Sequence, residues 1–300
     1  EKIAKEIYSN TGGKSPILEE TLLQKEALRQ ELIKHEDADF EIFICMRHWH
    51  PMTKEVIKNI ENYAPEEIIM LPLYPQFSTT TTASSIEEFT KNLNKEFVNK
   101  IKVKTICCYP IDEDFINSHV KLIEEKLQNN SDLSNFRMLF SAHGLPEKIV
   151  KSGDPYQWQI EQTVLKIVNK LKLNSKFKNI DYKVTYQSRV GPLKWLDPNT
   201  EDEIKIAGSI NKSLIIIPVA FVSEHVETLV ELDIEYKKIA DDCNIKYIRI
   251  PTLSTNELFI KSLANMVSNF AKQDSSCLLS SSLDRICPNV YSKCLCKGFN

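Results

Sequence analysis

The stretch Phe136-Arg-Met-Leu-Phe-Ser-Ala-His-Gly-Leu-Pro146 decides the fold class of this chain. Its first residues, Phe136–Ser141, form a short apolar run that is typical of a strand buried on both faces of a parallel sheet. His143 follows almost at once, and in open α/β sheets the ligand crevice lies at the carboxyl ends of the strands. The sequence therefore predicts an α/β protein with His143 in the region where chemistry usually occurs.

Similar apolar runs alternate with amphipathic helical patterns along almost all of the 300 residues. The predicted strands are Phe40–Met46, Ile68–Leu73, Ile101–Cys108, Phe136–Ser141, Tyr182–Gln187, Ser213–Ile217 and Ile245–Ile250. The predicted helices span residues 16–35, 51–63, 84–99, 112–128, 156–173, 200–210, 225–241 and 254–272. This alternation is typical of parallel sheets that helices cover on both faces.

The alternation breaks near Tyr109-Pro-Ile-Asp-Glu113, where a strand ends and a long helix begins. We expect two Rossmann-like lobes that face one another across a cleft, the first from residues 1–110 and the second from 111–253. Residues 254–300 are expected to form a last helix and a cysteine-rich tail that pack back on the first lobe. The serine-rich segment after Lys272 is interpreted as a linker, since it has too little core to become ordered alone.

Composition and charge exclude several classes of protein. With 38 basic and 41 acidic residues the net charge is −3, so no general electrostatic footprint for nucleic acid is present. No apolar run reaches the roughly 20 residues that span a bilayer, and no signal peptide opens the sequence. We expect a cytoplasmic protein whose membrane contact, if any, is peripheral and on the inner face. Its eight cysteines then favour metal ligands or buried thiols over disulfides.

A second imidazole, His225, opens a helical pattern that is rich in carboxylates. At about 100° per residue, one stripe holds Glu224, Glu227, Glu231 and Glu235. The opposite side holds Val226, Leu229, Val230 and Ile234. One interpretation is the solvated face of a surface helix. The other is a path for protons or cations, because like charges at this spacing repel and no lysine interrupts them.

Six blocks of the sequence, in order, resemble the ferrochelatase family, whose members insert ferrous iron into a porphyrin to make haem. They are Tyr8–Ile17, Met46–Pro51, Leu71–Ser85, Phe140–Tyr156, Tyr186–Leu196 and Phe221–Tyr236. The resemblance covers nearly all of the chain. It implies that a porphyrin binds between the lobes and is bent out of plane, which turns a pyrrole lone pair toward the incoming metal.

The resemblance also implies roles for individual residues. His143 corresponds to the family's active-site histidine, and Glu227 and Glu231 correspond to the acidic path beside it. Iron insertion releases two pyrrole protons, and a neutral imidazole can accept a proton or contact Fe²⁺, so His143 and Glu227 are the expected contacts of the substrate metal. A lone histidine after a strand is otherwise more often a satisfied core residue.

Other residues of these blocks are expected to bind the porphyrin. Tyr8 and Ser15 correspond to residues near its propionates, and Arg47 to a residue at the cleft, although Arg47 could equally form a structural ion pair. His48 stands where relatives often have tyrosine. The candidates for apolar walls of the cleft are Trp49, Tyr74, Phe77 and Trp195. Taken singly, each of these aromatic residues is more often an ordinary core residue.

Three cysteines, Cys287, Cys294 and Cys296, lie close together near the end of the chain. A fourth thiolate from Cys107 or Cys108 would complete a four-thiolate site. The resemblance to bacterial ferrochelatases with a C-terminal cysteine cluster implies a [2Fe–2S] cofactor. Zinc and metal-free thiols are the alternatives. The remaining thiols are expected to be structural; they are Cys45, Cys243 and Cys277.

Family members begin with a strand and a glycine-containing loop ahead of the segment that matches Tyr8–Ile17, and this sequence starts at Glu1 without them. We expect either a fragment or a first lobe without its first strand. The leading hypothesis is insertion of Fe²⁺ into protoporphyrin IX to form protohaem. The alternatives are another type-II tetrapyrrole chelatase, acting on coproporphyrin or inserting cobalt, and a haem or iron–sulfur sensor without turnover.

Overall fold

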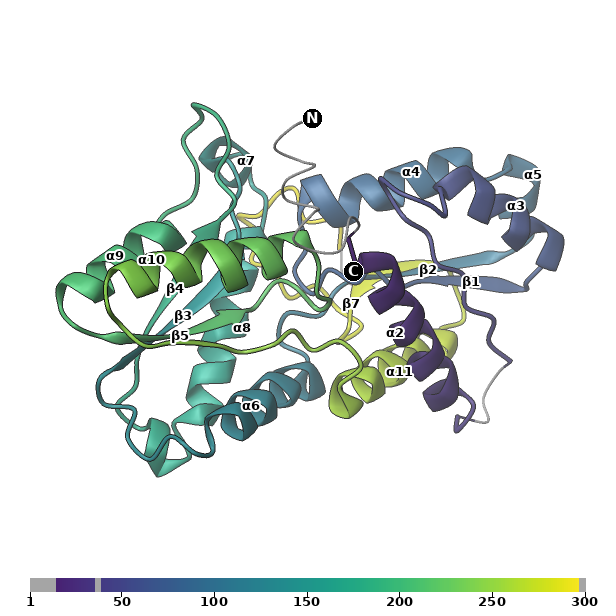
Figure 1. Cartoon of the computed structure of the whole chain (residues 1–300). Coiled ribbons are helices and arrows are strands. Elements are labelled where there is room, and N and C mark those ends of the chain that lie inside the picture. Colours follow the sequence, from purple (N-terminus) through teal and green to yellow (C-terminus); the bar gives the residue numbers. More distant parts are fainter. Residues whose placement is uncertain (1–14, 36–38, 297–300) are drawn as a thin grey trace.

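The computed structural model describes residues 15–35 and 39–296, and within them the chain forms two parallel sheets with helices on their faces (Figure 1). The first sheet has the order β1-β2-β7, from β1 (Glu67–Met70), β2 (Lys102–Cys108) and β7 (Cys277–Ser280). The second has the order β4-β3-β5-β6, from β3 (Phe136–His143), β4 (Asp181–Gln187), β5 (Ser213–Pro218) and β6 (Tyr247–Arg249). The predicted α/β fold class is confirmed.

The larger helices lie close to their predicted positions. They are α2 (Ile17–Leu32), α3 (Thr53–Tyr63), α4 (Ser84–Asn92), α6 (Glu113–Leu127), α8 (Tyr156–Leu171), α9 (Thr200–Ser209), α10 (Tyr236–Asp242) and α11 (Glu257–Ala271). Shorter elements are the π-helical turn η1 (Thr79–Ala83), α5 (Lys95–Val98), α7 (Glu147–Lys151) and the 3₁₀ turn η2 (Ser175–Phe177). In the described part of the chain, no helix is both long and apolar enough to cross a bilayer.

The second sheet is buried on both faces, which explains why its strands are continuously apolar. Met138 and Phe140 of β3 belong to the core beneath α6 and α8, whereas Leu139 belongs to the core beneath α9 and α10. Figure 1 shows α9 and α10 across one face of the sheet, with α6 and α8 on the other. His143, the last residue of β3, therefore emerges at the carboxyl edge of a sheet fixed from both sides.

In the first sheet, α11 connects strands and helices that are distant in sequence. It packs against α2 and α6 as well as against β1 and β2. The ammonium group of Lys104, fully buried on β2, donates to Glu67 Oε2 at 2.7 Å and to the carbonyl of Ala271 at 2.8 Å. A buried cation needs such partners, and the carbonyl end of a helix is a favourable place for it.

The predicted strand Phe40–Met46 is wrong. Within the described residues it has no ladder to any strand, and only an isolated bridge joins Met46 to Met52. Residues 40–46 and β1 instead line the same cavity. An apolar run predicts burial, but a strand also needs a hydrogen-bonding partner, and none of the described strands pairs with this run.

The tail after Lys272 is more ordered than the linker interpretation allowed. Residues Cys277–Ser280 form β7, parallel to β2, with Leu279 opposite Ile106. Leu279 is buried in the main core. The linker prediction is therefore wrong for this segment, because the edge of β2 supplies the backbone partners that the segment lacks by itself.

The predicted helix 225–241 is not one α-helix. It consists of a π-helix, η3 (Glu227–Glu235), followed by α10. A π-helix is wound more loosely than the 3.6-residue α-helix, so the predicted apolar side is misplaced. Ile234, assigned to that side, is 43% exposed. Val230, from the same predicted side, is buried, and the other buried positions are four residues apart: Thr228, Leu232, Tyr236 and Ala240.

Candidate active site

A cavity of about 1720 Å³ has walls from both halves of the structure. His143 at the end of β3 lines it, as do His225 and Glu227 from the segment after β5. The other side of the cavity is lined by Arg47 and by residues 40–46. The cavity therefore lies at the carboxyl edge of the second sheet, as the position of His143 predicted.

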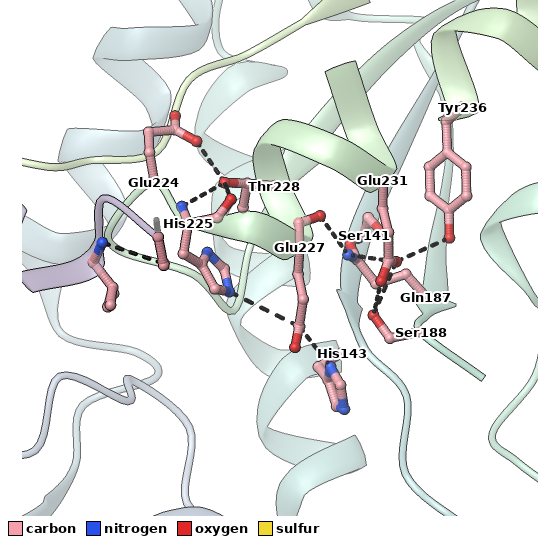
Figure 2. A network of polar contacts seen from close by, with 12 residues as sticks. Ser141, His143, Gln187, Ser188, Glu224, His225, Glu227, Thr228, Glu231 and Tyr236 are labelled. Carbon is pink, nitrogen blue, oxygen red and sulfur yellow. Dashed lines mark hydrogen bonds and ion pairs between the residues drawn. The ribbon is translucent and has the colours of Figure 1, made fainter. Parts of the chain in front are cut away.

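The centre of the site is an imidazole–carboxylate pair. His143 Nδ1 lies 2.8 Å from Glu227 Oε2, and both side chains are a little more than one-third exposed (Figure 2). His225 Nε2 lies 3.9 Å from the same oxygen. The Phe221 ring contacts both imidazoles, with centroid distances of 6.5 Å to His143 and 4.7 Å to His225. Within the described ranges His143 Nε2 has no hydrogen-bond partner, so it can meet a ligand in the cavity.

The charges of this pair shift its protonation equilibria in opposite directions. Burial alone would lower the pKa of His143, but the hydrogen bond and charge of Glu227, with the charge of Glu231, raise it above its ordinary value. Burial would raise the pKa of Glu227, and its bond to His143 together with both imidazole charges lowers it instead. Burial dominates at His225 and lowers its pKa. The pair can thus hold a proton on His143 beside an ionised Glu227.

Glu231 lies one step further from the cavity and is held by polar groups. Ser188 Oγ donates to its two oxygens at 2.8 and 2.9 Å, and Gln187 Nε2 donates to Oε2 at 3.1 Å. Gln187 Nε2 also donates to the backbone carbonyl of Glu227, so it joins the Glu231 carboxylate to the backbone of Glu227 (Figure 2). Burial raises the pKa of Glu231, as do the charges of Glu227 and Glu235, against the Ser188 bond.

Sequence reasoning did not select Gln187 and Ser188 as site residues. Gln187 ends β4 and is opposite His143 in the parallel ladder between β3 and β4. The signal available was therefore register: two polar residues that end the strand next to β3 reach the same edge. Tyr156, also missed, donates its hydroxyl to the backbone carbonyl of His143 at 3.0 Å.

The predicted acidic stripe is wrong at Glu224. This residue precedes η3 and turns toward β6, where its carboxylate accepts from both terminal nitrogens of Arg249 and from the backbone N–H of Thr252. Thr228 Oγ1 also donates to it, at 2.7 Å. Burial opposes ionisation, but the Arg249 bonds and charge lower the pKa of Glu224 to about 2. Glu224 is a fixed ion-pair partner and lies apart from the hydrogen bonds that join Glu227 and Glu231 through Gln187.

The residues expected to bind the porphyrin are only partly brought together. Arg47 and Trp195 line the cavity with His143, and the buried Nε of Arg47 has no hydrogen-bond partner among the described residues. Ser15 is near the start of α2, where its Oγ accepts from Ile17 N at 3.4 Å, and neither Ser15 nor the exposed His48 belongs to the cavity lining. Tyr8 lies outside the described residues.

The expected aromatic walls divide in the same way. Tyr74 and Trp195 line the cavity. Phe77 is fully buried in the main core, and Trp49 is 63% exposed outside the cavity lining. The expectation that all four form cavity walls is therefore wrong for Phe77 and Trp49.

A second group of reactive side chains, the thiol cluster, consists of Cys107, Cys108, Cys287, Cys294 and Cys296, all of them buried. The sulfurs of Cys107 and Cys108 are 3.6 Å apart, and Cys107 also shares a hydrogen bond with Cys296. Cys287 and Cys294 form a second hydrogen-bonded pair. In the described ranges, no group of three or more His, Cys, Asp or Glu side chains is arranged to hold a single metal ion.

The tail that carries three of these thiols is docked by specific contacts. The Arg285 guanidinium donates to the backbone carbonyls of Cys287 at 3.0 Å and Cys296 at 3.3 Å. Lys293 N donates to the carbonyl of Gly153, in the turn before α8. Gly153 has φ +100°, and a Cβ there would lie 2.5 Å from Ser292 Oγ. Only glycine allows the tail to approach this turn so closely.

The fold has a counterpart among solved structures of chelatases. SirB from Bacillus subtilis with Fe³⁺ has a TM-score of 0.58 and 14% sequence identity, with coverage of 83% of this chain and 89% of that one. The same sirohydrochlorin chelatase from Bacillus subtilis subspecies spizizenii in complex with cobalt has a TM-score of 0.55 at 13% identity, covering 84% and 89%. At this identity the comparison shows that the fold is that of the chelatases.

Sequence comparison is more specific. The family model for ferrochelatase matches residues 1–271. A ferrochelatase of Rickettsia felis is 58% identical, covering 100% of this chain and 85% of that protein. One of Pelagibacter ubique is 48% identical, covering 99% and 84%. The chain therefore belongs to the ferrochelatase family, enzymes of haem biosynthesis that insert Fe²⁺ into a porphyrin.

Proposed function

We propose that Fe²⁺ enters protoporphyrin IX in the cavity at His143, where two pyrrole protons leave and protohaem forms. The observation that supports this place is the His143–Glu227 pair at 2.8 Å on the cavity wall, where the second imidazole nitrogen has no hydrogen-bond partner among the described residues. His143 Nε2 accepts a pyrrole proton in its neutral form, and the ionised Glu227 stabilises the imidazolium that results. His143 and Glu227 are also the groups that contact the substrate iron.

The protons leave along the acidic path that Glu227 begins. Gln187 and Ser188 join the surroundings of Glu227 to Glu231, and the Tyr236 hydroxyl lies 3.5 Å from Glu231 at the far end. The pKa of Glu227 is lowered whereas that of Glu231 is raised. Two carboxylates with opposite shifts can pass a proton outward, because the second accepts it more readily than the first.

The macrocycle is held against the opposite wall by Arg47 and Trp195. Arg47 has a buried nitrogen without a partner among the described residues, and a guanidinium prefers a carboxylate such as a porphyrin propionate. Trp195 supplies an apolar surface near Gly144. Tyr8, Ser15 and His48 are assigned to the propionate end of the same ligand by the family resemblance alone.

The test is metallation of porphyrin by the purified protein with Fe²⁺ or with Zn²⁺, monitored by the loss of the fluorescence band of the metal-free porphyrin. Steady turnover of protoporphyrin IX is the expected result. Faster turnover of coproporphyrin III would change the substrate, and absence of turnover with either metal would favour a sensor that retains the fold.

We further propose that the thiol cluster holds a [2Fe–2S] centre through Cys287, Cys294 and Cys296 with either Cys107 or Cys108. Such a centre needs two pairs of thiolates, one for each iron, and not three side chains around one ion. The contacts Cys287–Cys294 and Cys107–Cys296 supply two pairs, and Cys108 adjoins the second. When bound, this group exchanges one electron and joins the tail to β2.

Iron, sulfide and zinc analysis with a visible spectrum tests this assignment. Cys294→Ala is expected to abolish the absorption of the centre, whereas Cys45→Ala, an exposed thiol outside the thiol cluster, is expected to leave it unchanged. Cys107→Ala and Cys108→Ala identify the fourth ligand, because only one of them removes the absorption. One zinc ion per chain without sulfide would replace the assignment.

Peripheral attachment of a cytoplasmic protein to the inner face of a membrane is our proposal for its location. Trp49, Met52, Val190 and Leu193 are large apolar side chains exposed to solvent. They occur within a few residues of Arg47 and Trp195 in the two loops at the cavity. Exposed apolar groups gathered near a site that takes an apolar ring favour contact with lipid. Co-sedimentation with anionic vesicles should weaken for Leu193→Ser and not for Leu173→Ser, a still more exposed leucine just after α8.

For the division of the chain we propose lobes at 1–110 and 111–253, with 254–300 returning to the first. The described part of the first sheet takes β1 and β2 from the first range and β7 from the last, and all four strands of the second sheet lie within 111–253. Limited proteolysis should cut between these ranges before it cuts inside them.

A further inference from the structure

Gln159 is a fully buried amide that none of the roles above uses. It lies on the inner side of α8, and its Oε1 accepts from the backbone N–H of Phe77 at 2.7 Å. Its Nε2 lies 3.0 Å from Cys287 Sγ and 3.5 Å from Cys108 Sγ. One side chain thus meets three segments that are far apart in the sequence.

The bond to Phe77 fixes the orientation of the amide. Because the backbone N–H can only donate, the atom facing Phe77 must be the oxygen, and the –NH₂ group must face the sulfurs. An amide nitrogen carries two protons, which matches two sulfur acceptors. Hydrogen bonds to thiolate sulfurs stabilise negative charge on them, and in iron–sulfur sites such bonds help to set the reduction potential.

The other end of the amide reaches the cavity wall. Phe77 continues into Ser78 and Thr79, whose hydroxyls donate to the buried carboxylate of Asp154 at 3.0 and 2.7 Å. Ser78 lines the cavity. Asp154 also accepts from Tyr156 N at the start of α8, and the Tyr156 hydroxyl donates to the carbonyl of His143. The first turns of α8 therefore contact the thiol cluster, the wall segment and the strand end that carries His143.

We propose that Gln159 is a positioning residue that couples the thiol cluster to the porphyrin cavity. Its two N–H groups donate to Cys287 and Cys108, and its carbonyl oxygen fixes the wall segment at Phe77. This inference rests on the proposed [2Fe–2S] centre, to which it adds a donor of hydrogen bonds and a connection to the substrate wall.

Two substitutions separate the two ends of the amide. Gln159→Glu keeps the shape and the acceptor for Phe77 N but replaces the donor that faces the sulfurs. Gln159→Leu removes both. The matched control is Gln162→Leu, the same change on a half-buried position of the same helix. The full-length protein with its centre is used, and thermal melting verifies that each variant folds; Gln159→Met replaces Gln159→Leu if the latter does not fold.

The readouts are the midpoint potential of the centre, from a redox titration followed by electron paramagnetic resonance, and the KM for protoporphyrin IX. We expect the potential to shift downward in both Gln159 variants, because the reduced centre loses a donor. The KM should rise about 3- to 10-fold in Gln159→Leu and stay within about twofold of the original in Gln159→Glu. Gln162→Leu should change neither.

Each other result counts against a defined part of the inference. An unchanged potential in both Gln159 variants overturns the donor role, and an unchanged KM in Gln159→Leu overturns the connection to the cavity. A wild-type protein that contains no iron–sulfur centre overturns the ligand assignment itself, and the role of Gln159 with it. That failure is recognised before any variant is made.

Discussion

Glu224 and Glu227 lie three residues apart, yet their surroundings differ completely. The Glu224 carboxylate accepts hydrogen bonds from Arg249, Thr252 and Thr228, and its side chain is 19% exposed. Glu227 is 37% exposed, and in the described part of the chain its carboxylate pairs with two imidazoles, one of them at hydrogen-bond distance. A carboxylate surrounded by fixed donors cannot exchange a proton near neutral pH, whereas one paired with a titratable ring can. Proximity in sequence therefore says little about shared function.

The largest effect is expected when the titratable partner itself is removed. His143→Ala should reduce turnover by about 10²- to 10⁴-fold, the range that a positioned acid–base group contributes. The assay is zinc insertion into protoporphyrin IX, with melting temperature as the measure of folding. A variant that melts normally and turns over at nearly the original rate would show that His143 takes no part in proton removal.

The next prediction exchanges the two carboxylates for amides. Glu227→Gln should lower kcat about 100-fold with little loss of stability, because its partner His143 can become neutral. Glu224→Gln should change kcat little but lower the free energy of unfolding by about 2–3 kcal/mol. The reason is that the mostly buried guanidinium of Arg249 cannot lose its proton when its partner is neutral.

Urea unfolding and initial rates measured on both variants check this exchange. Arg249→Lys serves as the control for Glu224, since it keeps the charge but loses the two-pronged contact. If Glu224→Gln proved as inactive as Glu227→Gln while keeping its stability, the two carboxylates would belong to one path after all.

A smaller effect concerns pH and stability. The pKa of His143 is raised above 6.5 and that of Glu227 is lowered below 4.5 in the folded protein. The stabilisation from this pair is therefore fully present between these two ordinary values. It is lost as pH rises through the raised pKa of His143 and as pH falls through the lowered pKa of Glu227.

Melting temperatures of the original protein and of His143→Ala, compared across pH, check this window. The difference should be greatest between the two ordinary values and shrink on either side. The corresponding difference for Glu224→Gln should persist into alkaline pH, because Arg249 stays charged there. A His143→Ala difference that persists equally far would mean that the pair does not titrate.

The smallest effect is expected at the outer carboxylate. Ser188→Ala removes a bond that lowers the pKa of Glu231, so that pKa should rise further and proton release should slow. We expect kcat to fall about two- to fivefold, as for the loss of one hydrogen bond. Steady-state kinetics at several pH values measure it. A fall as large as that of Glu227→Gln would place Ser188 in the inner part of the path.

The second sheet and the position of His143 could be predicted because the sequence of β3 alone indicates a strand buried on both faces. Its apolar residues face two cores, so the run Phe136–Ser141 is continuous, and a polar residue at its end must reach the sheet edge. The predictions for Phe40–Met46 and Cys277–Ser280 failed because strand formation there depends on a neighbouring strand. The first is apolar but without a ladder, and the second becomes a strand only because β2 lies beside it.

The arrangement of the carboxylates could be predicted only in part, because it depends on a rare helix type. Spacing by four keeps Glu227 and Glu231 close on either kind of helix, which is why their proximity was predicted correctly. The position of Glu224 depends on Arg249, a residue on another strand, and no local pattern reveals that pairing. The position of Gln187 beside His143 could be predicted only from the parallel register between β3 and β4.

The close approach of Ser292 to Gly153 has a consequence for how the protein matures. The tail can dock only on a turn that already joins β3 to α8, and contacts between such distant parts of a chain form late. Residues 287–296 also leave the ribosome long after Cys107 and Cys108, which they follow in the sequence. The thiols at the two ends of the cluster therefore meet only after the tail has been synthesised, so a polypeptide whose translation stops before Cys287 would present Cys107 and Cys108 without the partners they need.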